Sequence, residues 1–110
     1  MNINFNGYSE NVLTFECDNT VTAGKLVKMS ANGKVAAAAA NDDFVGVALS
    51  VSGGYAAVQL NGYVELQKTG TVNVGYNKLV ASNSSAVKTA ESGIDRLVIL
   101  VDGNAIGFIL

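Results

Sequence analysis

Residues 55–67 read Y-A-A-V-Q-L-N-G-Y-V-E-L-Q, and this stretch decides the fold class. Every even position in it is apolar or glycine, whereas polar side chains and tyrosines occupy most odd positions. Successive side chains of a strand point to opposite faces of a sheet, so the alternation predicts a β-strand with one buried face. We predict a single long strand, with Gly62 as a bend or bulge, because a hairpin at Asn61-Gly62 would mix the two faces.

The same alternation assigns individual side chains to the core. Val58 and Leu60 belong to the apolar face, and Gln59 belongs to the polar face. An isolated carboxylate in a core costs several kcal/mol, so we expect Val58→Asp and Leu60→Asp to prevent folding. Gln59→Asp is expected to be tolerated, because the polar face is predicted to meet solvent.

Turn signals divide the rest of the chain into short strands. Asn-Gly is the strongest short hairpin signal, and Asn32-Gly33 is predicted to join strands over residues 25–31 and 34–40. The alanines of residues 36–40 are predicted to form a strand, since so short a run does not nucleate a helix alone. Further turns are predicted at Ser52-Gly53-Gly54, Asn83-Ser84-Ser85 and Asp102-Gly103.

Alternation marks further strands over residues 11–17 and 44–51, and weaker strands are predicted over residues 78–82 and 86–89. In the strand over residues 44–51 one face carries Val45, Val47, Leu49 and Val51. Cys17 is predicted to be a small buried hydrophobe, because its neighbours are acidic rather than cationic and would not favour a reactive thiolate.

Residues 96–101 are apolar on both faces, which predicts a strand central in a sheet or covered by a partner. The turn at Asp102-Gly103 is predicted to pair this strand with residues 105–110. In that register Ile99 faces Ile106, and Leu97 faces Phe108.

The chain repeats itself weakly after 50 to 53 residues. The matching segments are residues 20–24 with 71–75, 25–27 with 78–80, 45–49 with 97–101 and 55–60 with 105–110. Both copies consist of strand and turn patterns. The predicted fold is therefore all-β, a small β-barrel or sandwich of short antiparallel strands with a weak internal duplication and an extended N-terminal arm.

A chain of 110 residues is expected to form one domain, here residues 11–110, preceded by an arm over residues 1–10. The arm carries Ile3, Phe5 and Tyr8 among polar residues. These side chains are too few to form a core, so we expect them to contact a partner or a sister chain by strand addition.

Composition indicates that part of the surface meets another chain. Hydrophobic residues make up 49% of the sequence and charged residues only 15%, against about 25% charged in a typical soluble domain. Obligate interfaces are apolar and poor in charge at their centre, which would explain the shortage. The alternative is a plain β-domain rich in Ala, Gly and Val that asparagine and serine keep soluble.

Several functional classes are not expected. The net charge is −2 and the seven basic residues are scattered, which argues against nucleic-acid binding. No apolar run reaches the length of about 18 residues that a transmembrane helix needs, and the first ten residues lack the pattern of a signal peptide. We therefore expect neither a nucleic-acid nor a membrane partner.

The sequence offers no constellation for catalysis, and we expect no enzyme, no metal and no cofactor. Histidine, the commonest general base, does not occur in it. Asp42-Asp43 is the only adjacent acidic pair and lacks the spacing of a calcium loop, so it is predicted to be a solvated turn. Tyr55 and Tyr63 share the predicted polar face and would stack on sugars or contact a partner. The alternative is that both tyrosines simply cover a barrel surface.

The stretch A-G-K-L-V-K-M-S-A-N-G-K-V-A-A-A-A-A-N-D-D-F-V-G-V-A-L, residues 23–49, resembles the capsid decoration proteins of tailed phages. In that family a strand opened by an A-G turn leads through a glycine-centred hairpin to an alanine-rich strand, a V-G-V-A-L strand and a V-x-L-x-G-x-V-x-L strand. The last element is V-Q-L-N-G-Y-V-E-L here, residues 58–66. Phe44 stands where relatives often have proline, and the polar start before Leu13 is longer than in relatives.

The resemblance implies a structural virion protein on the capsid exterior, made in the host bacterial cytoplasm. Such proteins bind the major capsid protein, commonly as trimers, and cement neighbouring capsomers against internal DNA pressure. The contact residues expected on this chain are Ile3, Phe5, Tyr8, Tyr55 and Tyr63. The alternative function is a small β-sheet module that binds carbohydrate or a host surface through its exposed tyrosines.

Overall fold

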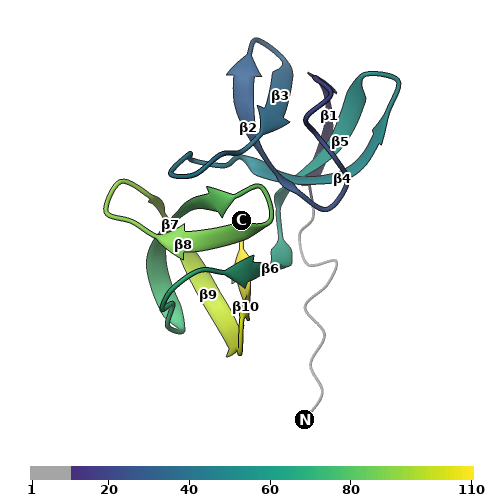
Figure 1. Ribbon diagram of the computed structural model, residues 1–110. Coiled ribbons are helices and arrows are strands. Elements are labelled where there is room, and N and C mark those ends of the chain that lie inside the picture. Colours follow the sequence, from purple (N-terminus) through teal and green to yellow (C-terminus); the bar gives the residue numbers. More distant parts are fainter. Residues whose placement is uncertain (1–10) are drawn as a thin grey trace.

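The computed structural model describes residues 11–110, and these form ten β-strands without a helix (Figure 1). The strands of the first half are β1 (Asn11–Cys17), β2 (Leu26–Ala31), β3 (Lys34–Ala37), β4 (Gly46–Ser52) and β5 (Tyr55–Asn61). Those of the second half are β6 (Tyr63–Lys68), β7 (Gly75–Asn83), β8 (Ala86–Thr89), β9 (Ile94–Asp102) and β10 (Ala105–Ile109). The predicted all-β class is confirmed.

The strands form two closed barrels, one above the other in Figure 1. The first barrel has the order β1-β3-β2-β4-β5, and the second has the order β10-β6-β8-β7-β9. Most neighbours are antiparallel, as predicted, but one pair in each barrel is parallel: β1 with β3, and β6 with β8. Each parallel pair spans only two residues of each strand.

The two barrels repeat one topology strand by strand, β1 corresponding to β6 and β5 to β10. They also share two irregularities of register: one at Ser30 and at Ser82, and one at Leu49 and at Ile99. A bulge adds one unpaired residue and bends its strand. Its recurrence at corresponding positions supports the duplication more strongly than the sequence match does.

The structure corrects parts of the sequence alignment. When the pairing of β2 with β3 is superposed on that of β7 with β8, Val27 falls on Leu79. The sequence comparison had matched Val27 to Val80. When the pairing of β4 with β5 is superposed on that of β9 with β10, Ala48 falls on Val98. The sequence comparison had matched Ala48 to Leu100, two positions further on. The drift arises because the connection between β3 and β4 is longer than that between β8 and β9.

The single long strand predicted over residues 55–67 is wrong, although its bend at Gly62 is confirmed. The strand β5 belongs to the first barrel and β6 to the second, and Gly62 joins them at φ 99°. Glycine adopts this positive φ without steric cost. The alternation continues across the junction because each barrel has its own inward face. On the outward face, however, some side chains are buried rather than exposed to solvent. Gln59, predicted to be exposed, is only 4% exposed.

The hairpin turns follow the sequence signals, with one shift. Ala31 pairs with Lys34, Ser52 with Tyr55 and Asn83 with Ala86, as the turn residues predict. At the last hairpin Asp102 pairs with Ala105, so the turn is Gly103-Asn104 and not Asp102-Gly103. Ile106 therefore faces Val101, and Phe108 faces Val98.

Two strand predictions need correction in detail. The alanine-rich strand ends at Ala37 rather than Ala40. In β4 the bulge interrupts the predicted apolar face. Val47 lies on the outer face and is buried in the cluster of the second barrel, whereas Leu49 and Val51 are exposed. An extra residue at a bulge shifts the side-chain alternation to the other face.

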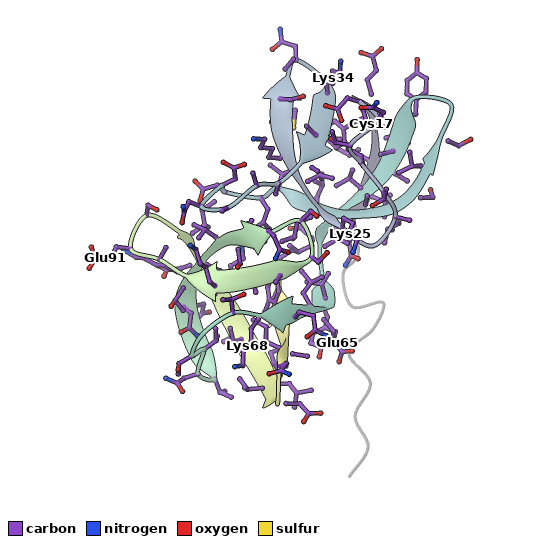
Figure 2. The ribbon with its side chains drawn as sticks, viewed as in Figure 1. Cys17, Lys25, Lys34, Glu65, Lys68 and Glu91 are labelled. Atoms are coloured by element: carbon purple, nitrogen blue, oxygen red, sulfur yellow. The ribbon has the colours of Figure 1, made fainter. Side chains whose placement is uncertain are left out.

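Each barrel has its own hydrophobic cluster, and the second cluster reaches into the first barrel. Cys17 is a free, buried thiol in the first cluster, as predicted (Figure 2). The second cluster combines the interior of the second barrel with Leu26, Ala38, Phe44 and Val47 from the first half. The ring centroids of Phe44 and Phe108 are 6.1 Å apart in an edge-to-face arrangement. Phe44 therefore belongs to the core of the second barrel.

Hydrogen bonds reinforce this contact between the barrels. The Leu26 amide donates to the Ser84 carbonyl at 2.8 Å. The Asn41 amide donates to the Ala81 carbonyl at 2.8 Å, and the Ala81 amide donates to the Asp42 carbonyl at 2.9 Å. Lys25 lies where the barrels meet (Figure 2), and its Nζ donates to Ser85 Oγ at 2.7 Å. The single domain over residues 11–110 stays a prediction, now with two barrels inside it.

Candidate interaction surfaces

The structure separates the residues predicted for contact. Ile3, Phe5 and Tyr8, with the whole arm over residues 1–10, lie outside the described residues. Tyr55 opens β5 in the first barrel and is 53% exposed. Tyr63 opens β6 in the second barrel and is 4% exposed, so the two tyrosines share no surface.

The prediction that Tyr63 lies on an exposed face is wrong. Its hydroxyl donates to Glu65 Oε2 at 2.7 Å. Burial and this carboxylate raise the pKa of Tyr63 to about 12. The ring occupies the space beside Gly107, where any Cβ would overlap it. A side chain held in this way is part of the structure of β6 and is not free to stack on a sugar.

An open groove of about 570 Å³ lies on the second barrel. Its lining is mostly apolar and comes from the start of β7, from β9 and from the C-terminal end of β10: Tyr76, Asp95, Arg96, Leu97, Ile99, Ile109 and Leu110. Tyr76 pairs with Leu97 across β7 and β9, so the two side chains stand together on the outer face. Three other hollows on the described residues have smaller volumes, of about 520, 380 and 110 Å³.

The sequence builds this groove through the two-sided apolar character of β9. Val98 points inward and is fully buried, so its neighbour Leu97 points outward. The bulge at Ile99 keeps a second apolar side chain in the groove lining. The run over residues 96–101 was predicted to be central in a sheet or covered by a partner. Strand β9 is central, because β7 and β10 pair with it on either side, and its outer face is open.

Arg96 is fixed at one border of the groove by the first barrel. Its guanidinium lies 4.7 Å from the centroid of the Phe44 ring, and Nη2 donates to the Phe44 carbonyl at 3.0 Å. Arg96 Nε is buried, and no group of residues 11–110 accepts its hydrogen. Burial lowers the pKa of Arg96, and the charge of Asp43 partly opposes this effect. Contact with Phe44 thus couples the groove to the interface between the barrels.

A polar hollow of about 520 Å³ lies on the other side of Tyr76. Its lining residues are Tyr76, Asn77, Lys78, Thr89, Ala90, Glu91 and Asp95. Tyr76 is 76% exposed, more than any other large apolar or aromatic side chain described. Sequence reasoning did not single out Tyr76; its signal was an aromatic residue next to a polar turn, which does not distinguish a platform from a covered side chain.

The acidic turn has a structural role. Asp42 forms an ion pair with Lys28 at 2.8 Å and accepts a hydrogen bond from the Ala39 amide at 2.8 Å. Both interactions lower the pKa of Asp42. Within residues 11–110 no three His, Cys, Asp or Glu side chains group together in a way that would hold a metal ion. The described part of the chain also contains no helix with the length and hydropathy to cross a membrane.

No protein-family model matches this chain, and the search of curated proteins finds no match to it.

Proposed function

We propose that the chain is a structural virion protein that decorates and stabilises the outside of a phage capsid by binding the major capsid protein. It is made in the host bacterial cytoplasm and acts on the capsid exterior, without catalytic activity, metal or cofactor. It assembles with itself, as a trimer if it follows the family that its sequence resembles.

The observation that carries this proposal is the apolar surface of a chain with little charge. Ten large apolar or aromatic side chains are exposed on the described residues, although only 15% of the sequence is charged. A contiguous exposed apolar patch marks a site of interaction with other proteins, and the groove that Tyr76, Leu97 and Ile99 line is such a patch. A cement protein needs such surface twice, for its sister copies and for the shell.

The resemblance identifies the partner in this proposal. The motif over residues 23–49 covers β2, β3 and β4, and the motif over residues 58–66 continues through β5 into β6. The capsid contact is proposed for Tyr55 together with Ile3, Phe5 and Tyr8 of the arm. Tyr63 is no longer included, because it is buried.

A second candidate function is the binding of a glycan on a host surface. Tyr76 favours it, because an exposed aromatic ring beside amide, acidic and basic side chains suits a sugar ring and its hydroxyl groups. Tyr76 thus replaces the pair Tyr55 and Tyr63 as the basis of this alternative.

Co-sedimentation with shells of the phage that encodes the chain tests the proposal. Wild-type protein should pellet with shells that lack it and stay in solution without them. Tyr55→Ala and deletion of residues 1–9 should each weaken attachment with little change in melting temperature. A matched control is Leu49→Ala, on an exposed residue outside the proposed contacts, which should not weaken attachment. Tyr76→Ala should abolish binding to a glycan panel if the second candidate is correct. Failure of the wild-type protein to pellet would refute capsid decoration.

A further inference from the structure

The two barrels of one chain already show how one barrel covers another. The covered face of the first barrel contains Leu26, Val47 and Gln59, which pair across β2, β4 and β5. All three residues are buried, and Leu26 and Val47 belong to the cluster of the second barrel. Strands β2 and β4 thus present an outer face that is apolar and occupied.

The corresponding face of the second barrel is the open groove. Leu97 and Ile109 correspond to Val47 and Gln59, because Val98 and Phe108 correspond to Ala48 and Val58. Beside β9, Tyr76 takes the place that Leu26 has beside β4, because it pairs with Leu97 as Leu26 pairs with Val47. Along β7 itself the register with β8 matches Leu26 to Lys78, two positions further on. The same row of the duplicated fold is therefore buried in one copy and open in the other.

The opposite half of the internal interface also has an open counterpart. On the second barrel Val64 pairs with Phe108, and Phe108 contacts the ring of Phe44. All three belong to the hydrophobic cluster that also contains Leu26 and Val47 of the first barrel. The residue of β1 that corresponds to Val64 is Leu13, because it pairs with Val58 as Val64 pairs with Phe108. Val64 is 7% exposed, whereas Leu13 is 55% exposed.

Within residues 11–110, two exposed surfaces thus correspond to the two halves of the internal interface. We propose that the groove around Tyr76 and Leu97 of one copy binds the end of the first barrel around Leu13 of a second copy. The contact repeats the packing of barrel on barrel and joins copies head to tail. A heterologous contact of this kind closes into a ring or grows into a filament.

One difference between the internal and the proposed contact concerns the aromatic anchor. Phe44 comes from the connection between β3 and β4, and the shorter connection between β8 and β9 contains only Ala90, Glu91, Ser92 and Gly93. The projecting aromatic residue on the open face is Tyr76 instead. We assign to Tyr76 the anchoring role in the contact between copies.

This proposal deepens the self-association named under the proposed function and rests on that part of it. Its test uses purified protein without shells, so a failure of capsid attachment does not affect the result. The probe is a second copy of the chain itself.

The experiment compares two surface variants by sedimentation velocity over a concentration series. Tyr76→Asp places a charge in the groove, and Leu13→Asp places a charge at the end of the first barrel. The control is Leu49→Asp, on an exposed residue outside both surfaces. Wild type and Leu49→Asp should associate with increasing concentration. Each of the other two variants alone should raise the concentration needed for association at least tenfold, with unchanged circular dichroism.

Mixing the two defective variants distinguishes the head-to-tail contact from a symmetric one. Tyr76→Asp protein keeps its barrel end and Leu13→Asp protein keeps its groove, so an equimolar mixture should form dimers and nothing larger. Association of Leu13→Asp like wild type, no dimer in the mixture, or a wild-type protein that stays monomeric into the millimolar range would each overturn the proposal. If an aspartate variant loses its circular dichroism signal, Tyr76→Ala and Leu13→Ala replace it in the same series.

Discussion

Gln59 lies at the junction of the two barrels and uses its amide nitrogen as a donor twice. Nε2 donates to the Asn61 carbonyl at 2.9 Å and to the Tyr63 carbonyl at 3.3 Å. A buried polar side chain is tolerated when its hydrogen bonds are made. The expectation that Gln59→Asp would be tolerated is therefore withdrawn, because an acceptor would face two carbonyl oxygens.

Gln59→Glu tests this role with almost no change in shape. At neutral pH the introduced carboxylate should cost about 3 kcal/mol or more of unfolding free energy, since a buried charge would be left without a donor. Burial should also raise its pKa above the unfolded value of about 4.3. The deficit is therefore smallest below that pH and grows as the pH rises. Urea unfolding at pH 4 and pH 7 measures it, with exposed Gln67→Glu as the control; equal deficits in both variants would contradict the assigned role.

Tyr63 predicts a loss of stability in alkali. Its folded pKa is raised to about 12, whereas an unfolded tyrosine titrates near pH 10. The unfolded chain therefore releases this proton first, and the stability that depends on it is present below pH 10 and lost as the pH rises towards 12. Tyr63→Phe should lose less stability than wild type between pH 9 and pH 11.5 in urea unfolding. Tyr55→Phe is the control, and identical pH profiles for wild type and Tyr63→Phe would refute the prediction.

At the scale of single elements, alternation and turn residues were sufficient to predict the all-β class and most hairpins. They failed where burial depends on the other barrel. The glycine at position 62 marks a bend, but the alternation runs unbroken through it, so the sequence did not show that the chain passes there from one barrel to the other. Gln59 and Tyr63 carry polar groups that local reasoning assigns to solvent, and only the packing at the barrel junction buries them.

The candidate surfaces show the same limit. The apolar run of β9 indicated an unusual strand, but the sequence did not show which of its faces is open. The bulge at Ile99 was not predicted, because it depends on the register with β10. Tyr76 gained its interest only when the structure placed it between an apolar groove and a polar hollow.

Strand β4 offers a test of how closely the elements pack. A Cβ at Gly46 would overlap the Gln59 carbonyl oxygen and lie 2.9 Å from Val58 Cγ1. Backbone cannot give way as a flexible side chain does, so Gly46→Ala should cost about 2 kcal/mol or more. Ser50→Ala, on the exposed part of the same strand, should change stability by less than about 0.5 kcal/mol. Chemical denaturation measures both, and similar values for the two variants would show that β4 is not held against β5 in this way.

At the scale of the whole molecule, Phe44 links the stabilities of the two barrels. It belongs to the first half of the chain yet packs on Phe108 and Arg96 in the second barrel. Phe44→Ala should cost about 3–5 kcal/mol, the usual range for removing a buried aromatic ring. Calorimetry should show one transition for wild type and separate, lower transitions for Phe44→Ala. Phe15→Ala, in the first barrel only, is the control; a single unshifted transition in Phe44→Ala would mean that the barrels do not depend on this contact.

The attachment of this two-barrel molecule to the outside of a phage shell is the central claim, and electron cryo-microscopy of shells incubated with the purified protein tests it most directly. Shells saturated with wild-type protein should show added density on their outer surface into which the two stacked barrels fit, at positions that repeat with the symmetry of the shell. Shells without added protein should lack that density. Saturated shells whose outer surface is identical to that of bare shells would contradict the account.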